Sequence, residues 1–175
     1  MHNLIVIRDP QPWTEELRRT ISQCERSWAA NLHASEEWLT LQAEKAVFVS
    51  AFIIRKLMDS NKFEPHVKQL SVTAGLVSIR QPAAELPSYL TWQEVDEYYD
   101  FERISELALR LRDLVNRLIH SYAFLVVGAY DSSVDDPFGF YFNSDHTRID
   151  ELLYLEWATY KEVVRRAEDG VIRAR

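Results

Sequence analysis

Apolar residues recur at steps of three and four along most of this chain, and this spacing constrains its fold more than any other feature. One such stripe consists of Leu17, Ile21, Cys24, Trp28 and Leu32. The period is that of one face of an amphipathic helix. Only four glycines and six prolines occur among the 175 residues, so few tight turns interrupt the pattern. The sequence therefore predicts long helices around one core.

A second helix is predicted from Ser35 to about Asp59. Ser35 suits the N-cap, and the two glutamates after it suit the positive end of the helix dipole. The middle of this segment, A-V-F-V-S-A-F-I-I, is apolar nearly all round, which indicates a central position in the fold. Arg55 lies near the C-terminal end, where a cation suits the dipole, although it could also reach inward to a site.

Two further long helices are predicted in the second half of the chain. A capping box at Thr91 to Glu94 precedes a regular apolar stripe, and this stripe predicts one helix from Phe101 to Tyr122. A last helix is expected from about residues 143–145 to Gly170, followed by a tail that frays from about residue 171.

Strand signals are confined to two places. Apolar and polar residues alternate around Gly75 in residues 67–80, which predicts a β-hairpin. The runs F-L-V-V-G-A-Y and F-G-F-Y-F flank a turn-rich acidic loop and predict a second hairpin. The predicted fold is thus mainly α, a bundle of about four long helices with a small antiparallel β-element of one or two hairpins, within a single domain of residues 1–175.

Composition narrows the setting and the kinds of partner. The single cysteine, Cys24, cannot form an intramolecular disulfide, and its place in an apolar stripe predicts a core residue. No stretch approaches the roughly 20 apolar residues of a membrane span, and Leu4 to Ile7 is too short for a signal-peptide core, so we expect a cytoplasmic protein with no membrane partner. A net charge of −7 disfavours non-specific binding to a phosphate backbone but leaves room for a local cationic cleft.

Several common sites are not supported. The sequence has no P-loop, no dinucleotide-binding fingerprint and no G-x-S-x-G, and its five histidines are not paired at helical ligand spacing. We therefore expect neither a cofactor nor a metal. One open alternative is a metal-dependent nuclease that uses Asp131, Asp135 and Asp136, although acidic residues beside serine and proline are typical of a solvated turn.

The candidate catalytic residues come from the run N-R-L-I-H-S-Y, Asn116 to Tyr122. On one continuous helix, Asn116 and Arg117 fall within about 60° of His120. We predict that His120 acts as acid or base, that Asn116 orients it, and that Arg117 or Arg112 binds a phosphate, with support from Tyr122. These parts would suit metal-free cleavage of RNA. The alternative is that they form only the polar face that every surface helix needs.

The same run resembles the signature of HEPN domains (higher eukaryotes and prokaryotes nucleotide-binding), which are helical bundles. It keeps the family's asparagine as Asn116 and its histidine as His120, and Ser121 and Tyr122 resemble the usual continuation, while Val115 stands where the family has an arginine. The resemblance implies a homodimer that contacts RNA or a nucleotide. It would be a metal-independent endoribonuclease or a catalytically degenerate relative, in a defence or toxin–antitoxin setting.

A non-catalytic protein-interaction module, such as an antitoxin or a scaffold, is the other hypothesis. The negative net charge would suit a basic protein partner. The valine at position 115 also favours this hypothesis, because it removes the family's cation from the motif.

Overall fold

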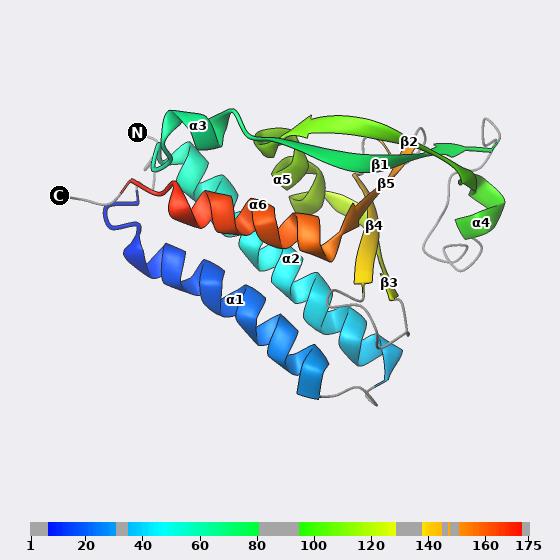
Figure 1. Cartoon of the computed structure of the whole chain (residues 1–175), viewed down its shortest axis with the longest axis horizontal. Helices are drawn as coiled ribbons and strands as arrows, with labels where there is room; N and C mark the ends of the chain where they lie inside the picture. Colours follow the sequence, from blue (N-terminus) through cyan, green and yellow to red (C-terminus); the bar gives the residue numbers. More distant parts are fainter. Residues whose placement is uncertain are drawn as a thin grey trace, which may run out of the picture.

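The protein combines a group of helices with one antiparallel sheet (Figure 1). The structure, a computed structural model, describes residues 7–30, 35–80, 95–128, 138–144, 147 and 151–172. The helices are α1 (Gln11–Ala30), α2 (Glu36–Asp59), α3 (Pro65–Lys68), α4 (Val95–Tyr98), α5 (Leu111–Ile119) and α6 (Trp157–Asp169). The strands are β1 (Ser71–Ile79), β2 (Tyr99–Arg110), β3 (Ser121–Gly128), β4 (Phe138–Ser144) and β5 (Glu151–Glu156). Within these ranges, no helix is both long enough and apolar enough to cross a membrane.

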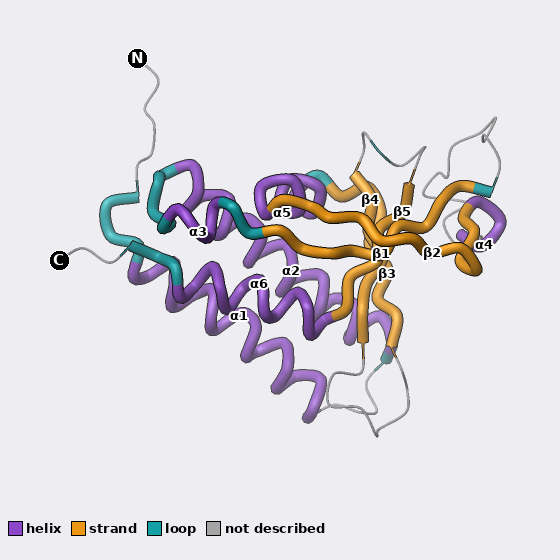
Figure 2. Tube along the Cα trace, turned by 45° about the horizontal axis from the view of Figure 1, so that its top comes forward, coloured by secondary structure: helices purple, strands orange, loops and turns teal. Residues whose placement is uncertain are grey.

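The predicted bundle of four long helices is wrong, because a sheet of five strands forms a large part of the fold. The strand order is β2-β1-β5-β4-β3, and every pairing is antiparallel. Figure 2 shows the helices gathered to one side of the strands, with only α4 at the far end. The prediction of α1 and α2 as long helices is confirmed, and the side chain of Ser35 caps α2 by accepting a hydrogen bond from the Trp38 amide at 3.3 Å.

The helix predicted from Phe101 to Tyr122 is instead strand β2 followed by the short helix α5. The apolar residues of β2 fit both periods, since Leu107 is two residues from Leu109 and is also three residues from Ile104 and four from Leu111, which belong to the predicted helical stripe. Pairing with β1 decides between the two structures. Leu109 lies opposite Val72 and Leu107 opposite Ala74, so their side chains share the buried face of the sheet.

The remaining β predictions were partly right. Strands β3 and β4 form the predicted second hairpin. The first predicted hairpin is wrong, because β1 is one continuous strand that pairs with β2 on one side and with β5 on the other. The last predicted helix is also shorter than expected, because its N-terminal part is strand β5. As predicted, it ends at Gly170.

The main core lies between the helices and the inner face of the sheet. Phe140 and Phe142 point inward from β4, and the ring of Phe140 meets Tyr160 of α6 edge-on, with centroids 5.6 Å apart. Tyr160 is fully buried, and its hydroxyl donates to the carbonyl of Val47 at 3.0 Å and lies 2.7 Å from the hydroxyl of Ser50. This deeply buried phenol is thus hydrogen-bonded, which avoids the desolvation cost of an unpaired polar group.

The segment after α6 is attached to the start of α3. Val171 is buried and forms an isolated antiparallel bridge with Phe63, and the amide of Ile172 donates to the carbonyl of Lys62 at 2.8 Å. A methyl group at Gly170 would overlap the side chain of Val67, so the two segments approach closely at that glycine. Residues 173–175 of the tail predicted to fray lie outside the described residues.

We expect Cys24 to be unreactive in the native protein. Its side chain is 2% exposed in the core, which confirms the prediction from the sequence, and burial raises the pKa of its thiol to about 12. Because the thiolate is the reactive species, a maleimide at pH 8 should label the native chain slowly and the urea-unfolded chain completely. Rapid stoichiometric labelling of the native protein, measured by intact mass, would contradict this placement.

Candidate functional site

Helix α5 carries the predicted catalytic residues or ends beside them. It starts where β2 leaves the sheet, and the amide of Leu111 donates to the carbonyl of Leu70 at 2.9 Å. Its apolar face is fully buried and consists of Leu111, Leu114, Val115 and Leu118. Val115, which stands where the HEPN signature has an arginine, is therefore a core residue, and a cation there would be buried among apolar side chains.

Two of the candidates face the C-terminal end of α2. Asn116 accepts a hydrogen bond at its Oδ1 from Nη1 of Arg55. Arg55 also donates from Nε to Asp59 at 2.8 Å, and Arg112 donates from Nη1 to the same carboxylate at 3.2 Å. Burial by itself would raise the pKa of Asp59, but the hydrogen bonds from Arg55 and Arg112 outweigh it and the pKa is lowered. These four side chains thus link α2 to α5.

Arg117 is directed to another part of the molecule. It forms an ion pair with Glu151, the first residue of β5, and both side chains are largely buried. Burial lowers the pKa of the Arg117 guanidinium, and the carboxylate of Asp113 opposes that shift. The side chain therefore joins α5 to the sheet. To bind a phosphate it would have to leave Glu151.

His120 lies at the exposed end of the helix. It is the C-cap residue, and its backbone amide donates to the carbonyl of Asn116 at 3.0 Å. The structure brings Asn116 and Arg112 together beside α2 but directs Arg117 to β5. Tyr122 lies on β3, where it is half-buried. Within one chain, Arg117 is therefore directed away from Asn116 and Arg112.

The alternative metal site cannot be placed on this fold. Asp131, Asp135 and Asp136 lie outside the described residues. They belong to the chain between β3 and β4. The hypothesis of a metal-dependent nuclease therefore stays a prediction from the sequence.

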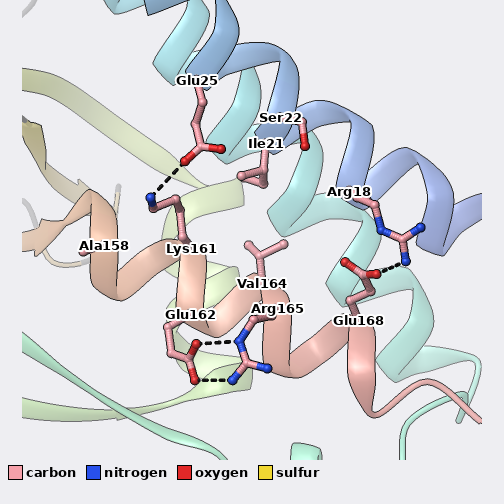
Figure 3. Close-up of a pocket in the computed structure, with 10 residues that line it drawn as sticks. All are labelled: Arg18, Ile21, Ser22, Glu25, Ala158, Lys161, Glu162, Val164, Arg165 and Glu168. Carbon is pink, nitrogen blue, oxygen red and sulfur yellow. Dashed lines mark hydrogen bonds and ion pairs between the residues drawn. The ribbon is translucent and has the colours of Figure 1, made fainter. Parts of the chain in front are cut away.

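A groove of about 410 Å³ runs between α1 and α6 (Figure 3). Its apolar floor includes Ile21 and Val164. Its charged side chains pair with one another: Arg18 with Glu168, Lys161 with Glu25 at 2.9 Å, and Arg165 with Glu162 at 2.7 Å. Each of these cations already has a carboxylate partner. The groove is therefore better described as the packing interface between α1 and α6 than as a binding site.

The outer face of the sheet, away from the main core, was not anticipated from the sequence. The strand registers place one row of residues across all five strands: Glu106, Gly75, Tyr154, Tyr141 and Leu125. In the row beside it, Glu156 lies opposite Gly139. Neighbouring rows on one face are two residues apart, so these side chains all point outward. The signal in the sequence was the alternation in F-G-F-Y-F and E-L-L-Y-L-E.

Two tyrosines occupy the centre of this outer face. The rings of Tyr141 and Tyr154 have centroids 4.9 Å apart, and Phe101 meets Tyr141 edge-on at 5.2 Å. A Cβ at Gly139 would overlap the ring of Tyr154, so this ring lies directly on the backbone of β4. Partial burial raises the pKa of both tyrosines, and for Tyr154 the carboxylate of Glu156 adds to the shift. The rings are half-buried and remain neutral near pH 7.

Comparisons of the chain with protein-family models, with curated proteins and with solved structures gave no match. Residue roles are therefore not carried over from a relative. The geometry and the charge of the side chains described above are what distinguish an interaction module from a metal-independent ribonuclease.

Proposed function

We propose that this protein is a non-catalytic interaction module that binds a basic protein partner on the outer face of its sheet. The observation that carries the proposal is the surface formed by Tyr141 and Tyr154 together with Ile104, which is 50% exposed, beside the carboxylates of Glu106 and Glu156. Half-buried tyrosines beside exposed apolar groups are typical of protein interfaces. The face can therefore provide apolar contact area without a large change of shape.

The negative charge of the outer face favours a basic protein over RNA as its partner. Aromatic side chains on a sheet can also stack on the bases of RNA, but such surfaces combine the rings with a cationic groove. Here Glu106 and Glu156 stand beside the rings, and the whole chain carries −7. A phosphate backbone would be repelled at this surface. A protein segment with lysine or arginine between apolar residues would be attracted.

The contacts of α5 give less support to a ribonuclease. Asn116 and Arg112 each hold a partner on α2, whereas Arg117 points away from them to Glu151 of β5. Catalysis in this region would require these side chains to give up contacts that join elements of the fold. The interaction hypothesis requires no such rearrangement, because the outer face is already formed.

We include a homodimer in the proposal. Two copies would present two outer faces to one partner. A partner with two basic segments would then bind more tightly than either segment alone, because the second contact becomes intramolecular. The outer face does not itself depend on dimerisation, so the two parts of the proposal can be tested separately.

Binding of a basic peptide tests the outer face directly. A fluorescein-labelled peptide of alternating lysine and leucine should bind the protein, and replacing both Glu106 and Glu156 by lysine should weaken binding by roughly tenfold or more, about 1.4 kcal/mol. The matched control replaces Glu15 and Glu64 by lysine, which changes the net charge equally on α1 and before α3. Equal weakening in both variants, measured by fluorescence anisotropy, would show that only net charge matters and would overturn the proposed face.

The competing function, a metal-independent ribonuclease, can be tested with the same preparations by measuring cleavage of RNA. If the protein is an interaction module, the wild type and His120→Ala should leave a single-stranded RNA equally intact in EDTA. Cleavage by the wild type that is lost in His120→Ala, with an unchanged far-UV circular dichroism spectrum, would overturn the proposal in favour of a metal-independent ribonuclease.

A further inference from the structure

We propose that strand β3 of this protein pairs antiparallel with β3 of a second copy, so that two sheets of five strands join into one. This inference rests on the homodimer of the proposed function and identifies its interface. It concerns a different surface from the one proposed for the basic partner, namely the edge of the sheet and not its face.

Strand β3 is at one end of the strand order (Figure 1). Within the described residues it pairs with β4 alone. A strand that pairs on one side presents half of its backbone amides and carbonyls along the other side, and these groups can form a ladder with another chain. Ser121–Gly128 offers eight residues for such a ladder, which is longer than the average strand.

The sequence of β3 has neither the charges nor the prolines that commonly protect an edge, and its pairing with β4 is irregular only between Ser121 and Ala123. The residues S-Y-A-F-L-V-V-G include no charge and no proline. Natural edge strands commonly carry lysine, other charges or proline, which prevent pairing with further chains. The opposite edge of this sheet follows that rule, because β2 carries Asp100, Glu102, Arg103, Glu106 and Arg110. The contrast between the two edges indicates that β3 is covered and that β2 is not.

Apolar side chains flank β3 on both faces of the sheet. On the helix side, the ring of Phe124 lies 5.4 Å from that of Phe48 in α2, and Phe52, one turn further along, is 46% exposed. On the outer face, Leu125 is half-buried and Val127 is 39% exposed. A strand added beside β3 would remove from water the apolar side chains that flank β3 on the helix side and on the outer face. Burial of apolar area would therefore add to the energy of the backbone ladder.

A second copy of this chain fits this edge better than the basic partner of the outer face. An edge without carboxylates gives no counter-charge to lysine or arginine, and in a chain of net charge −7 the contact should avoid placing like charges together. An isologous pair meets both conditions, because each uncharged β3 meets another uncharged β3. Antiparallel pairing about a twofold axis also places apolar side chains opposite apolar ones on both faces.

The test is the oligomeric state of the full chain. By sedimentation velocity over a range of concentrations, the wild type should be a dimer. Val127→Lys should weaken the dimer by roughly 100-fold or more, since a lysine on an edge strand opposes pairing with a further chain and its charge would lose water in the joined sheet. Val127 is already partly exposed, so the substitution should not prevent folding, and circular dichroism checks this. The matched control is Ile104→Lys, which places the same charge on the other edge strand and should leave the dimer intact.

Hydrogen exchange of the same proteins decides whether the ladder itself forms. The amides of 121–128 should exchange more slowly in the wild type than in Val127→Lys, while those of the central strand β1 should not differ. A dimer that persists unchanged in folded Val127→Lys would overturn the β3 interface but not the homodimer. A wild type that is monomeric at every concentration would overturn both, and neither result would affect binding of the basic peptide to the outer face.

Discussion

Phe140→Ala should lower the free energy of unfolding by about 3–5 kcal/mol, the usual cost of removing a buried phenylalanine ring. Phe140 is completely buried at the centre of the main core. Its ring stacks on Phe124 with centroids 5.1 Å apart and also meets the rings of Phe142 and Tyr160. Removing it would leave a cavity between β3, β4 and α6, because three rigid neighbouring rings cannot collapse into the space.

Urea denaturation at a protein concentration low enough to keep the chain monomeric is the appropriate measurement. Ile104→Ala is the control, because Ile104 is half-exposed on β2 and its truncation should cost less than about 1 kcal/mol. Similar midpoints for the two variants would show that Phe140 does not lie at the centre of the core. The slope of the transition should stay the same in both, since the area exposed on unfolding hardly changes.

Tyr99→Ala should destabilise the protein by about 3–5 kcal/mol, through loss of a fully buried aromatic side chain. Tyr99 lies on the outer side of the sheet, where it covers Val77 and Leu152. Its hydroxyl accepts a hydrogen bond from Nδ2 of Asn143 at 3.1 Å, and Oδ1 of Asn143 accepts from the amide of Ala123 at 3.2 Å. The side chain thus joins the start of β2 to β4 and, through Asn143, to β3.

Tyr99→Phe separates the two contributions of this residue. It keeps the ring but leaves Nδ2 of Asn143 without its acceptor, which should cost about 1–3 kcal/mol. In the alanine variant, hydrogen exchange should also accelerate at residues 95–103 before it does in β1. If the two variants unfold at the same urea concentration, the ring contributes nothing, and the second core cluster is wrongly placed.

The candidate site could be predicted from the sequence only as far as local spacing reaches. Helical spacing is a local signal, by which residues four apart, such as Arg112 and Asn116 in α5, share a face. It could not show that Arg55 and Asp59, more than fifty residues earlier, occupy that side. Nor could it show that Glu151 pairs with Arg117. Those contacts depend on how distant segments pack. In the structure they link α5 to α2 and to β5 through side chains that the sequence predicted to be catalytic.

The outer face of the sheet could not be predicted from the sequence, for a related reason. Alternation in E-L-L-Y-L-E indicates a strand but does not reveal which strand lies beside it. The row that joins Tyr154 to Tyr141 and to Gly75 exists only because β5 lies between β4 and β1. The same amino acids in another strand order would not form this surface.

The sequence by itself determined the elements whose signals are local and unambiguous. These are the two long helices, the cap at Ser35, the hairpin of β3 and β4 and the burial of Cys24. In each case a side chain forms a hydrogen bond with a neighbouring backbone group, or the spacing of the apolar residues fits only one period and so identifies the buried face. No distant partner is needed for the outcome.

Only the tertiary structure decided that residues 101–110 and Glu151–Glu156 form strands and not helices. Both segments have apolar residues compatible with either period, so the local preference is weak and the hydrogen-bond partner decides. Strand β1 supplies that partner on both of its sides and turns the N-terminal parts of two expected helices into strands. The backbone hydrogen bonds and the apolar packing that form when three distant segments join into one sheet outweigh the local tendency to form a helix.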